Sequence, residues 1–294
     1  PLLFWISGMG VRFALERRSV LQLVADRSLR ILLPWAFGTF VLGITTWVLL
    51  DRLGWQRPYK PGFGHLWFLL NIYLYAVTLV GALVYLRQRP EHPILRGMRR
   101  LLGWRIGPYL LALPMALEAG LLDPTYYSLY VDTLHGWVLG LICFVVGFLC
   151  ASVQEAFWPA VTRLRWTSLV LGFGLFLVRY LCFESQAELD ALTALESTAW
   201  MLAVFGFGAR YLNRPSRALS YLSSAVYPVY ILHLPVQFLA SAWVLEQPWP
   251  TTVQFLALLV LTLGICMAID ELVLRRVKPL RPLFGRKWSS AQSS

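Results

Sequence analysis

The chain has 294 residues, of which 58% are hydrophobic and only 14% are charged. A soluble domain carries about 25% charged residues, so this composition excludes an ordinary soluble enzyme and indicates a membrane protein. The formal net charge of +11 suggests anionic partners, but the placement of the basic residues explains it without a nucleic acid.

The first apolar run, PLLFWISGMGV, has 11 residues before Arg12. A helix of that length covers roughly 16 Å, which is too short to cross about 30 Å of hydrocarbon. The run has neither the basic segment nor the cleavage site of a signal peptide. Because the sequence also begins with Pro1, we expect the run to be the remainder of a longer helix in an N-terminally truncated chain.

Eight longer apolar runs follow, and each approaches the ~20 residues that span a bilayer. They lie at about 31–50, 66–86, 106–122, 134–153, 167–183, 194–212, 225–245 and 252–274. Helices are expected because every backbone polar group must be satisfied within lipid. The sequence therefore predicts an all-α, polytopic bundle of about nine visible helices, with a single domain over 1–288 and a disordered tail over 289–294.

Most of the 26 basic residues fall in alternating connections on one side of the predicted bundle, which are 12–30, 87–105, 163–165, 210–217 and the tail from 275. The other side receives only Arg52, Arg57 and Lys60. This asymmetry predicts that the basic side and the C-terminus are cytoplasmic, and that the inner loops meet anionic membrane lipid.

Polar side chains inside a bilayer are costly, which makes each one a candidate for function. His65 is the second residue of the stretch GHLWFLLNIYLYAV. Its position fits either an interfacial residue beside Trp67 or a residue of a functional site. Asn71 lies deeper in the same run. His135, in DTLHGW, is interpreted as interfacial.

Three charged residues, Glu118, Arg179 and Glu196, lie near the outer ends of their helices. We expect ion pairs there, at the outer mouth of a cavity, with either a structural or a catalytic role. At the inner end of the last run, Glu271 and Arg275 have the spacing of a surface ion pair.

The deepest histidine is His233, in AVYPVYILHLPV between Pro228 and Pro235. Tyr227, Tyr230 and His233 recur every third residue and so form a polar stripe on one helix. Such a stripe faces protein or a water-filled cavity rather than lipid, either as a packing network or as a site. The four cysteines all fall within apolar runs and lack metal-ligand spacing, so they are interpreted as packing residues and no metal is expected.

Four blocks in the same order resemble the acyltransferase 3 family of bacterial integral membrane O-acyltransferases. They are PLLFWISGMG, DRSLRILLPW, GHLWFLL and SSAVYPVYILHLPV. Within the family, the third and fourth blocks are most similar to the glucan biosynthesis protein C branch, which is linked to succinyl transfer. The resemblance implies about ten helices, and the family's leading helix, with its catalytic histidine, is not in this sequence.

The resemblance implies transfer of an acetyl or succinyl group from cytoplasmic acyl-CoA to a hydroxyl of an extracytoplasmic glycan or glycolipid at the bacterial inner membrane. The catalytic residues would be His65, His233, Tyr230 and Asn71. The acceptor would contact Tyr227, Trp67, Arg179 and Glu196. The acyl-CoA phosphates would contact Arg27, Arg30, Arg17 and Arg18, which ordinary membrane topology also explains.

Two other functions fit the same helices. A transporter or flippase of a glycan or lipid intermediate would share the polar cavity, although the sequence shows no convincing inverted repeat. A non-catalytic membrane scaffold would not explain His233 at depth. The sequence also leaves open whether the acyl group is threaded across the bilayer or relayed.

Overall fold

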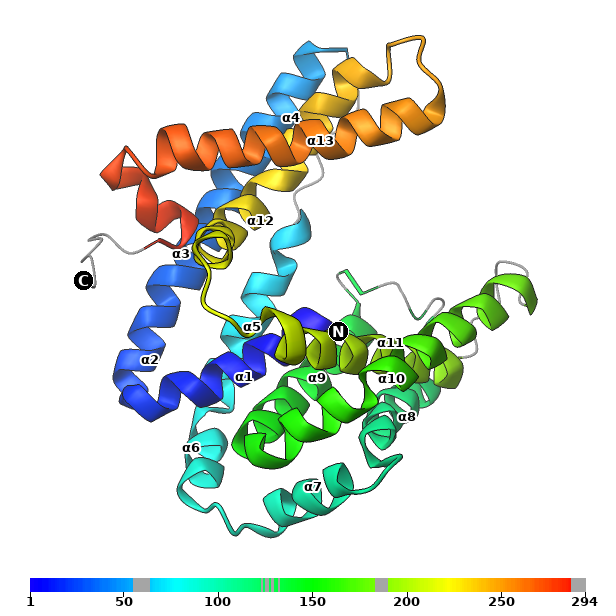
Figure 1. The fold of residues 1–294 in the computed structure, drawn as a ribbon. Helices are drawn as coiled ribbons and strands as arrows, with labels where there is room; N and C mark the ends of the chain where they lie inside the picture. Colours follow the sequence, from blue (N-terminus) through cyan, green and yellow to red (C-terminus); the bar gives the residue numbers. More distant parts are fainter. Residues whose placement is uncertain are drawn as a thin grey trace. The chain divides into compact units, whose positions relative to one another are not determined.

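The computed structural model describes residues 1–54, 64–122, 124, 127, 130–131, 133–182 and 190–286. All regular structure in these residues is helical. The chain forms two compact units, which are described separately (Figure 1). The first unit comprises Pro1–Leu23 and Leu74–Arg214, and the second comprises Val24–Tyr73 and Pro215–Ser294. Arg57, Lys60 and the predicted tail lie outside the described residues, and the single domain stays a prediction.

Six helical stretches in the described residues are long and apolar enough to cross a membrane. They are Val20–Arg52, Leu134–Ser152, Gln154–Leu181, Asp190–Leu212, Arg217–Val244 and Thr251–Leu274. A seventh span is possible across Gly64–Thr78 and Val80–Gln88, which are bent by 57° relative to each other. The predicted polytopic, all-α membrane bundle is confirmed, whereas several of the predicted boundaries change.

The first unit is built from α1 and the helices of the middle of the chain. Their bounds are α1 Leu2–Arg17, α6 Val80–Gln88, α7 Pro93–Gly103, η4 Gly107–Ala112, α8 Leu113–Leu122, α9 Leu134–Ser152, α10 Gln154–Cys182, α11 Asp190–Phe207 and η5 Gly208–Leu212. The symbol η marks short 3-10 or π segments. Helix α1 packs along α9, and α10 packs along α11 (Figure 1).

Glycines let α1 and α9 approach closely. A side chain on Gly8 would collide with the backbone of Phe144, and one on Gly147 would collide with the backbone of Trp5. Small residues at helix crossings are how membrane helices gain packing contacts. The crossing also buries Trp5, whose ring lies 5.6 Å from that of Phe205 on α11.

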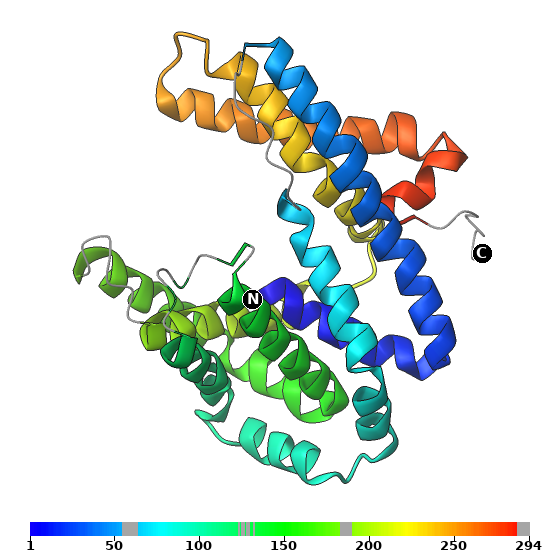
Figure 2. The same ribbon diagram turned by 180° about the vertical axis from the view of Figure 1, so that it is seen from behind.

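The second unit combines helices from both ends of its sequence. Their bounds are α2 Val20–Arg27, η1 Ser28–Leu32, α3 Leu33–Phe37, η2 Gly38–Leu42, α4 Gly43–Arg52, η3 Gly64–Leu66, α5 Trp67–Thr78, α12 Arg217–Val244, α13 Thr251–Ile269, η6 Asp270–Leu274 and η7 Lys278–Phe284. Helix α2 begins, and α5 ends, in the first unit. Helix α12 packs between α4 and α13 (Figure 2).

Two expected boundaries are wrong in the same direction, because helices continue where connections were predicted. The predicted connection 12–30 is almost entirely helical, since α1 runs to Arg17 and α2 starts at Val20. Arg163 and Arg165 lie inside α10 rather than in a loop. Arginine is a good helix former and extends its charge to water on a long stem, so a helix continues beyond the apolar run. The run at 66–86 is instead interrupted at Leu79.

Candidate active site

His65 and Tyr230 hold each other through their backbones. The His65 Nε2 atom lies 3.0 Å from the carbonyl oxygen of Tyr230. In return, the Tyr230 hydroxyl donates a short hydrogen bond to the carbonyl oxygen of His65. The two contacts fix the start of α5 to the middle of α12 within the second unit, although the sequence predicted neither.

His233 uses the same acceptor as His65. Its Nδ1 atom lies 2.6 Å from the Tyr230 carbonyl oxygen, and its ring centroid lies 4.7 Å from that of His65. A carbonyl oxygen only accepts hydrogen bonds, so both ring nitrogens must carry a proton. In the neutral rings, Nδ1 of His65 and Nε2 of His233 therefore keep their lone pairs. Each is then able to accept a proton from a bound hydroxyl.

Proline frees two other carbonyl groups near this turn of α12. Pro235 has no N–H for the carbonyl of Ile231, and its ring crowds that carbonyl. Pro228 likewise leaves the carbonyl of Ser224 without its helical donor, and Arg286 donates to that oxygen at 3.1 Å. The two prolines thus each leave one carbonyl of α12 open to a donor other than the helix's own backbone.

A glycine brings a third element against the pair. Gly38, in η2, lies so close to the second unit's core that an added side chain would meet Leu66 and Ile231. Leu66 follows His65 directly, and Ile231 follows Tyr230. The ring of Phe68 adds an edge contact to Tyr230, with 6.0 Å between centroids.

The other predicted residues of the second unit lie on the same two helices. Asn71 is buried in α5, which Trp67 begins. Tyr227 is half-buried on α12, and its hydroxyl is buried without a hydrogen-bond partner in the described part of the chain. The ring of Tyr227 lies against Gly285, whose backbone has a positive φ of 69°.

The four predicted acyl-CoA arginines divide between the units. Arg17 and Arg18 line a hollow of about 380 Å³ at the end of α1 in the first unit. Arg27 ends α2, and Arg30 lies in η1, both in the second unit. Arg30 forms an ion pair with Asp26, with 3.0 Å between Nε and Oδ1.

The predicted pair between Arg179 and Glu196 forms in the first unit. The guanidinium binds the carboxylate through two contacts, Nε to Oε2 at 2.8 Å and Nη2 to Oε1 at 3.2 Å. This bidentate geometry joins α10 to α11.

His135 was expected to be an exposed, interfacial residue, but it is buried within the first unit. Its side chain is only 3% exposed and is paired through Nδ1 with Glu118 Oε1 at 2.9 Å. Its Nε2 atom lies 3.0 Å from the carbonyl oxygen of Tyr127. An imidazole bonded at both nitrogens loses little on leaving water, which explains its burial. Glu118 lies in α8 and His135 lies in α9, so helical spacing could not predict that they pair.

Sequence reasoning also missed a buried carboxylate. Asp270 is fully buried, and both of its oxygens accept from Arg286 Nη2, at 2.6 and 2.7 Å. Arg275 reaches it as well, at 3.1 Å, while forming the predicted ion pair with Glu271 at 3.1 Å. These contacts hold the segment after α13 together, and Arg275 also donates to Ser224 Oγ of α12 at 2.9 Å.

Fold and site together define a multi-pass helical membrane protein with two adjacent imidazoles on one backbone carbonyl. A family profile described as an acyltransferase domain, acyltransferase 3, matches residues 1–271. The chain belongs to this acyltransferase 3 family.

The chain is also similar to glucans biosynthesis protein C from Salmonella paratyphi A and from Salmonella agona, with 23% identity over 260 residues in each case. These alignments cover 83% of this chain, which spans 65% of the length of each relative. No solved structure matches the chain.

Proposed function

We propose that the protein is a membrane O-acyltransferase that moves an acetyl or succinyl group from cytoplasmic acyl-CoA to a hydroxyl of an extracytoplasmic glycan or glycolipid. The observation that carries the proposal is the His65–His233 pair on the Tyr230 carbonyl, in a chain of the acyltransferase 3 family. We place the protein in the bacterial inner membrane with its C-terminus in the cytoplasm, on the asymmetry of its arginines.

The pair supplies general acid–base chemistry. A sugar hydroxyl is a poor nucleophile at neutral pH, and a neutral imidazole within hydrogen-bond reach takes its proton. His233, whose Nδ1 is committed to the backbone, offers Nε2 as that base. The sugar oxygen attacks the thioester carbonyl, and the tetrahedral intermediate expels the thiolate of coenzyme A. The imidazolium returns the proton to the thiolate, so the ring ends the cycle neutral.

His65 and Tyr230 have a positioning role in this scheme. The Tyr230 hydroxyl is already committed to the carbonyl of His65, so it holds His65 rather than the oxyanion. The oxyanion of the intermediate needs other donors. The unpartnered hydroxyl of Tyr227 and the amide of Asn71 are the neutral donors that we assign to it.

The donor would be held by guanidinium groups. Arg27 and Arg30 lie on consecutive helical segments, and Arg17 and Arg18 share a hollow at the end of α1. Phosphates form charge-assisted, bidentate bonds with arginine. In this scheme an acyl-CoA phosphate competes with Asp26 for Arg30.

The acceptor is assigned to the extracytoplasmic side. The relatives are named for glucan biosynthesis, which favours a glucan or a related glycan. In the second unit, Trp67 offers an aromatic face for a sugar ring. Separately, in the first unit, the pair of Arg179 and Glu196 offers charged hydrogen-bonding groups for sugar hydroxyls. Membrane lipid surrounds the spans, and the scheme uses no nucleic acid and no bound cofactor.

The proposal is tested in membranes from cells that express the full-length protein. Such membranes are incubated with radiolabelled acetyl-CoA or succinyl-CoA, and label is followed into extracytoplasmic glycan. We expect protein-dependent label in glycan from one of the two donors. Absence of transfer from both donors, with protein-dependent glycan movement across sealed vesicles, would establish the transporter instead.

One observation favours that transporter as the second candidate. The span formed by Gly64–Thr78 and Val80–Gln88 is broken by a bend of 57°, and transporters bind substrate at broken helices. The break at Leu79 lies at the far end of α5 from His65, and family membership favours the enzyme.

A further inference from the structure

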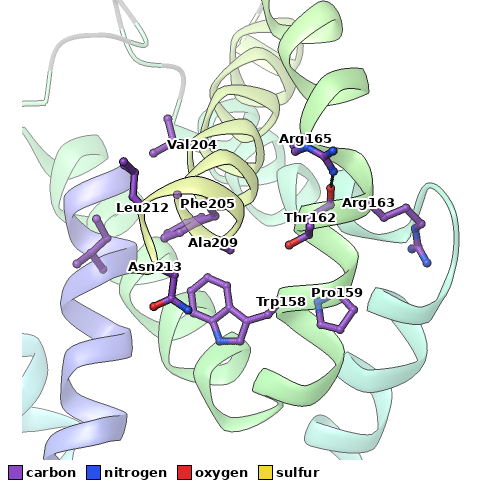
Figure 3. Close-up of a pocket in the computed structure, with 12 residues that line it drawn as sticks. Trp158, Pro159, Thr162, Arg163, Arg165, Val204, Phe205, Ala209, Leu212 and Asn213 are labelled. Atoms are coloured by element: carbon purple, nitrogen blue, oxygen red, sulfur yellow. Dashed lines mark hydrogen bonds between the residues drawn. The ribbon is translucent and has the colours of Figure 1, made fainter. Parts of the chain in front are cut away.

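The first unit contains a groove that the proposed reaction does not use. It lies between α10 and α11 with η5, has a volume of about 1020 Å³, and is open to the surface (Figure 3). Its walls are mainly apolar, and they include Ile6, Trp158, Pro159, Val204, Phe205 and Leu212. Val204 and Leu212 remain 50% and 66% exposed. Their apolar surface is therefore available for contact with a ligand in the groove.

Two arginines border this groove. Arg163 and Arg165 come from α10 and lie among its lining residues with Thr162 and Asn213 (Figure 3). Arg165 donates to the carbonyl of Thr162 at 2.5 Å, and Arg163 donates to that of Trp104 at 3.2 Å. Each guanidinium has five N–H donors, so both keep most of their donors for another group.

In the part of the chain that the structure describes, neither charge is neutralised by an ion pair. Among the described residues, no carboxylate forms an ion pair with Arg163 or Arg165. Other arginines of the same unit do have such partners, namely Arg12 with Glu16, Arg99 with Glu155 and Arg179 with Glu196. Two uncompensated cations beside an apolar groove on a membrane-spanning helix fit a ligand with an anionic head and hydrocarbon tails.

We propose that this groove is a binding site for an anionic phospholipid. The phosphate would accept hydrogen bonds from Arg165, Arg163 would add positive charge nearby, and the acyl chains would cover Leu212 and Val204. Basic pockets between membrane helices bind anionic headgroups in this way. A zwitterionic lipid would cover the same apolar walls, but its headgroup cation would be repelled by the two guanidinium groups. We therefore expect it to bind more weakly.

Glycine offers a way to fill the groove without disturbing the helices. Gly208 lines it, and a side-chain carbon added there meets nothing within 4 Å. Gly174, on α10, is equally open but does not line the groove. Gly208→Leu and Gly174→Leu thus form a matched pair, and Arg210, exposed in η5, provides the matched charge change for the two arginines.

The test uses the full chain in detergent, titrated with phosphatidylglycerol or phosphatidylcholine of the same acyl chains, with bound lipid counted by native mass spectrometry. We expect tighter binding of phosphatidylglycerol. The Arg163→Gln, Arg165→Gln double variant should bind it roughly 30-fold more weakly, because each arginine contributes about a fivefold factor. Gly208→Leu should weaken the binding of both lipids.

Controls separate a lost site from a damaged fold. Gly174→Leu and Arg210→Gln should bind phosphatidylglycerol as the wild type does, and all variants should elute as a single species of the same size. Equal affinity for the two lipids, or double-variant and Gly208→Leu affinities equal to wild type, would overturn the proposal. Displacement of phosphatidylglycerol by coenzyme A would also overturn it, since the groove would then be a nucleotide site.

Discussion

The imidazole rings of His65 and His233 lie 4.7 Å apart and donate to a single backbone carbonyl, that of Tyr230. This relationship places two imidazole rings at one point of a unit with membrane-spanning helices, where we propose that His233 transfers the proton and His65 positions it. The contacts around the pair, and the packing within each unit, lead to testable outcomes.

Tyr230→Phe should reduce the acyl transfer rate about tenfold without abolishing it. The variant loses the hydrogen bond to the His65 carbonyl but keeps the Tyr230 carbonyl, so His65 is less well positioned and the base remains. The effect should fall on kcat more than on KM, measured with labelled acyl-CoA. Tyr211→Phe, exposed in η5, is the control. A loss as large as that of the histidine variants would assign the hydroxyl directly to the chemistry.

Gly38→Ala should slow transfer severalfold, because its new methyl group collides with the side chain of Leu66 and must displace this neighbour of His65. Catalytic geometry displaced by about 1 Å loses rate steeply. Gly43→Ala is the matched control in the same helical stretch, where the added carbon only makes an ordinary contact at 3.6 Å. Equal rates for the two variants would show that this close approach does not support the pair.

Gly147→Ala should destabilise the first unit by about 1–3 kcal/mol, which is the usual cost of overpacking. The added carbon collides with the backbone of Trp5, which cannot rotate away as a side chain does. Thermal unfolding in detergent should show a lower midpoint than wild type. Gly174→Ala, which meets open space, should unfold like wild type, and the same midpoint for both variants would argue against the close α1–α9 crossing.

Asp270→Asn should lower the unfolding midpoint far more than Glu271→Gln. Asp270 is fully buried against Arg286 and Arg275, and breaking a buried pair costs about 3–5 kcal/mol. Glu271 is half exposed, and such a surface pair is worth at most about 1 kcal/mol. Similar midpoints for the two variants would mean that the segment after α13 is not held by this network.

The membrane spans were predictable because their signal is local. Length and apolar composition identify a span, and the spacing of Tyr227, Tyr230 and His233 places them on one face of α12. The ion pair of Glu271 with Arg275 follows from helical spacing alone. The helix ends were missed because arginines at the water interface do not end a helix.

The pairing within the candidate site was not predictable, because it depends on tertiary contacts. His65 meets a residue 165 positions away, and nothing in GHLWFLL indicates which helix it faces. The burial of His135 depends on Glu118 from another helix. The burial of Asp270 depends on Arg286, which follows η7. From the sequence alone, a polar residue near a helix end is therefore predicted to be interfacial, and only the structure shows the partner that allows it to be buried.

The most direct test of the catalytic assignment is the transfer rate of His65→Ala and His233→Ala in the full-length protein, with His92→Ala as the control. His92 caps α7 through Ile94 and packs against the ring of Tyr85, and neither contact involves the pair, so that variant should keep the wild-type rate. We expect His233→Ala to lose about 100-fold or more, the range for general acid–base groups, and His65→Ala to lose more than Tyr230→Phe does, because it removes the ring that the Tyr230 hydroxyl positions. The double variant should lose little beyond the worse single variant, because the two rings act as one unit. Wild-type rates of labelled acyl transfer in both single variants would contradict the account.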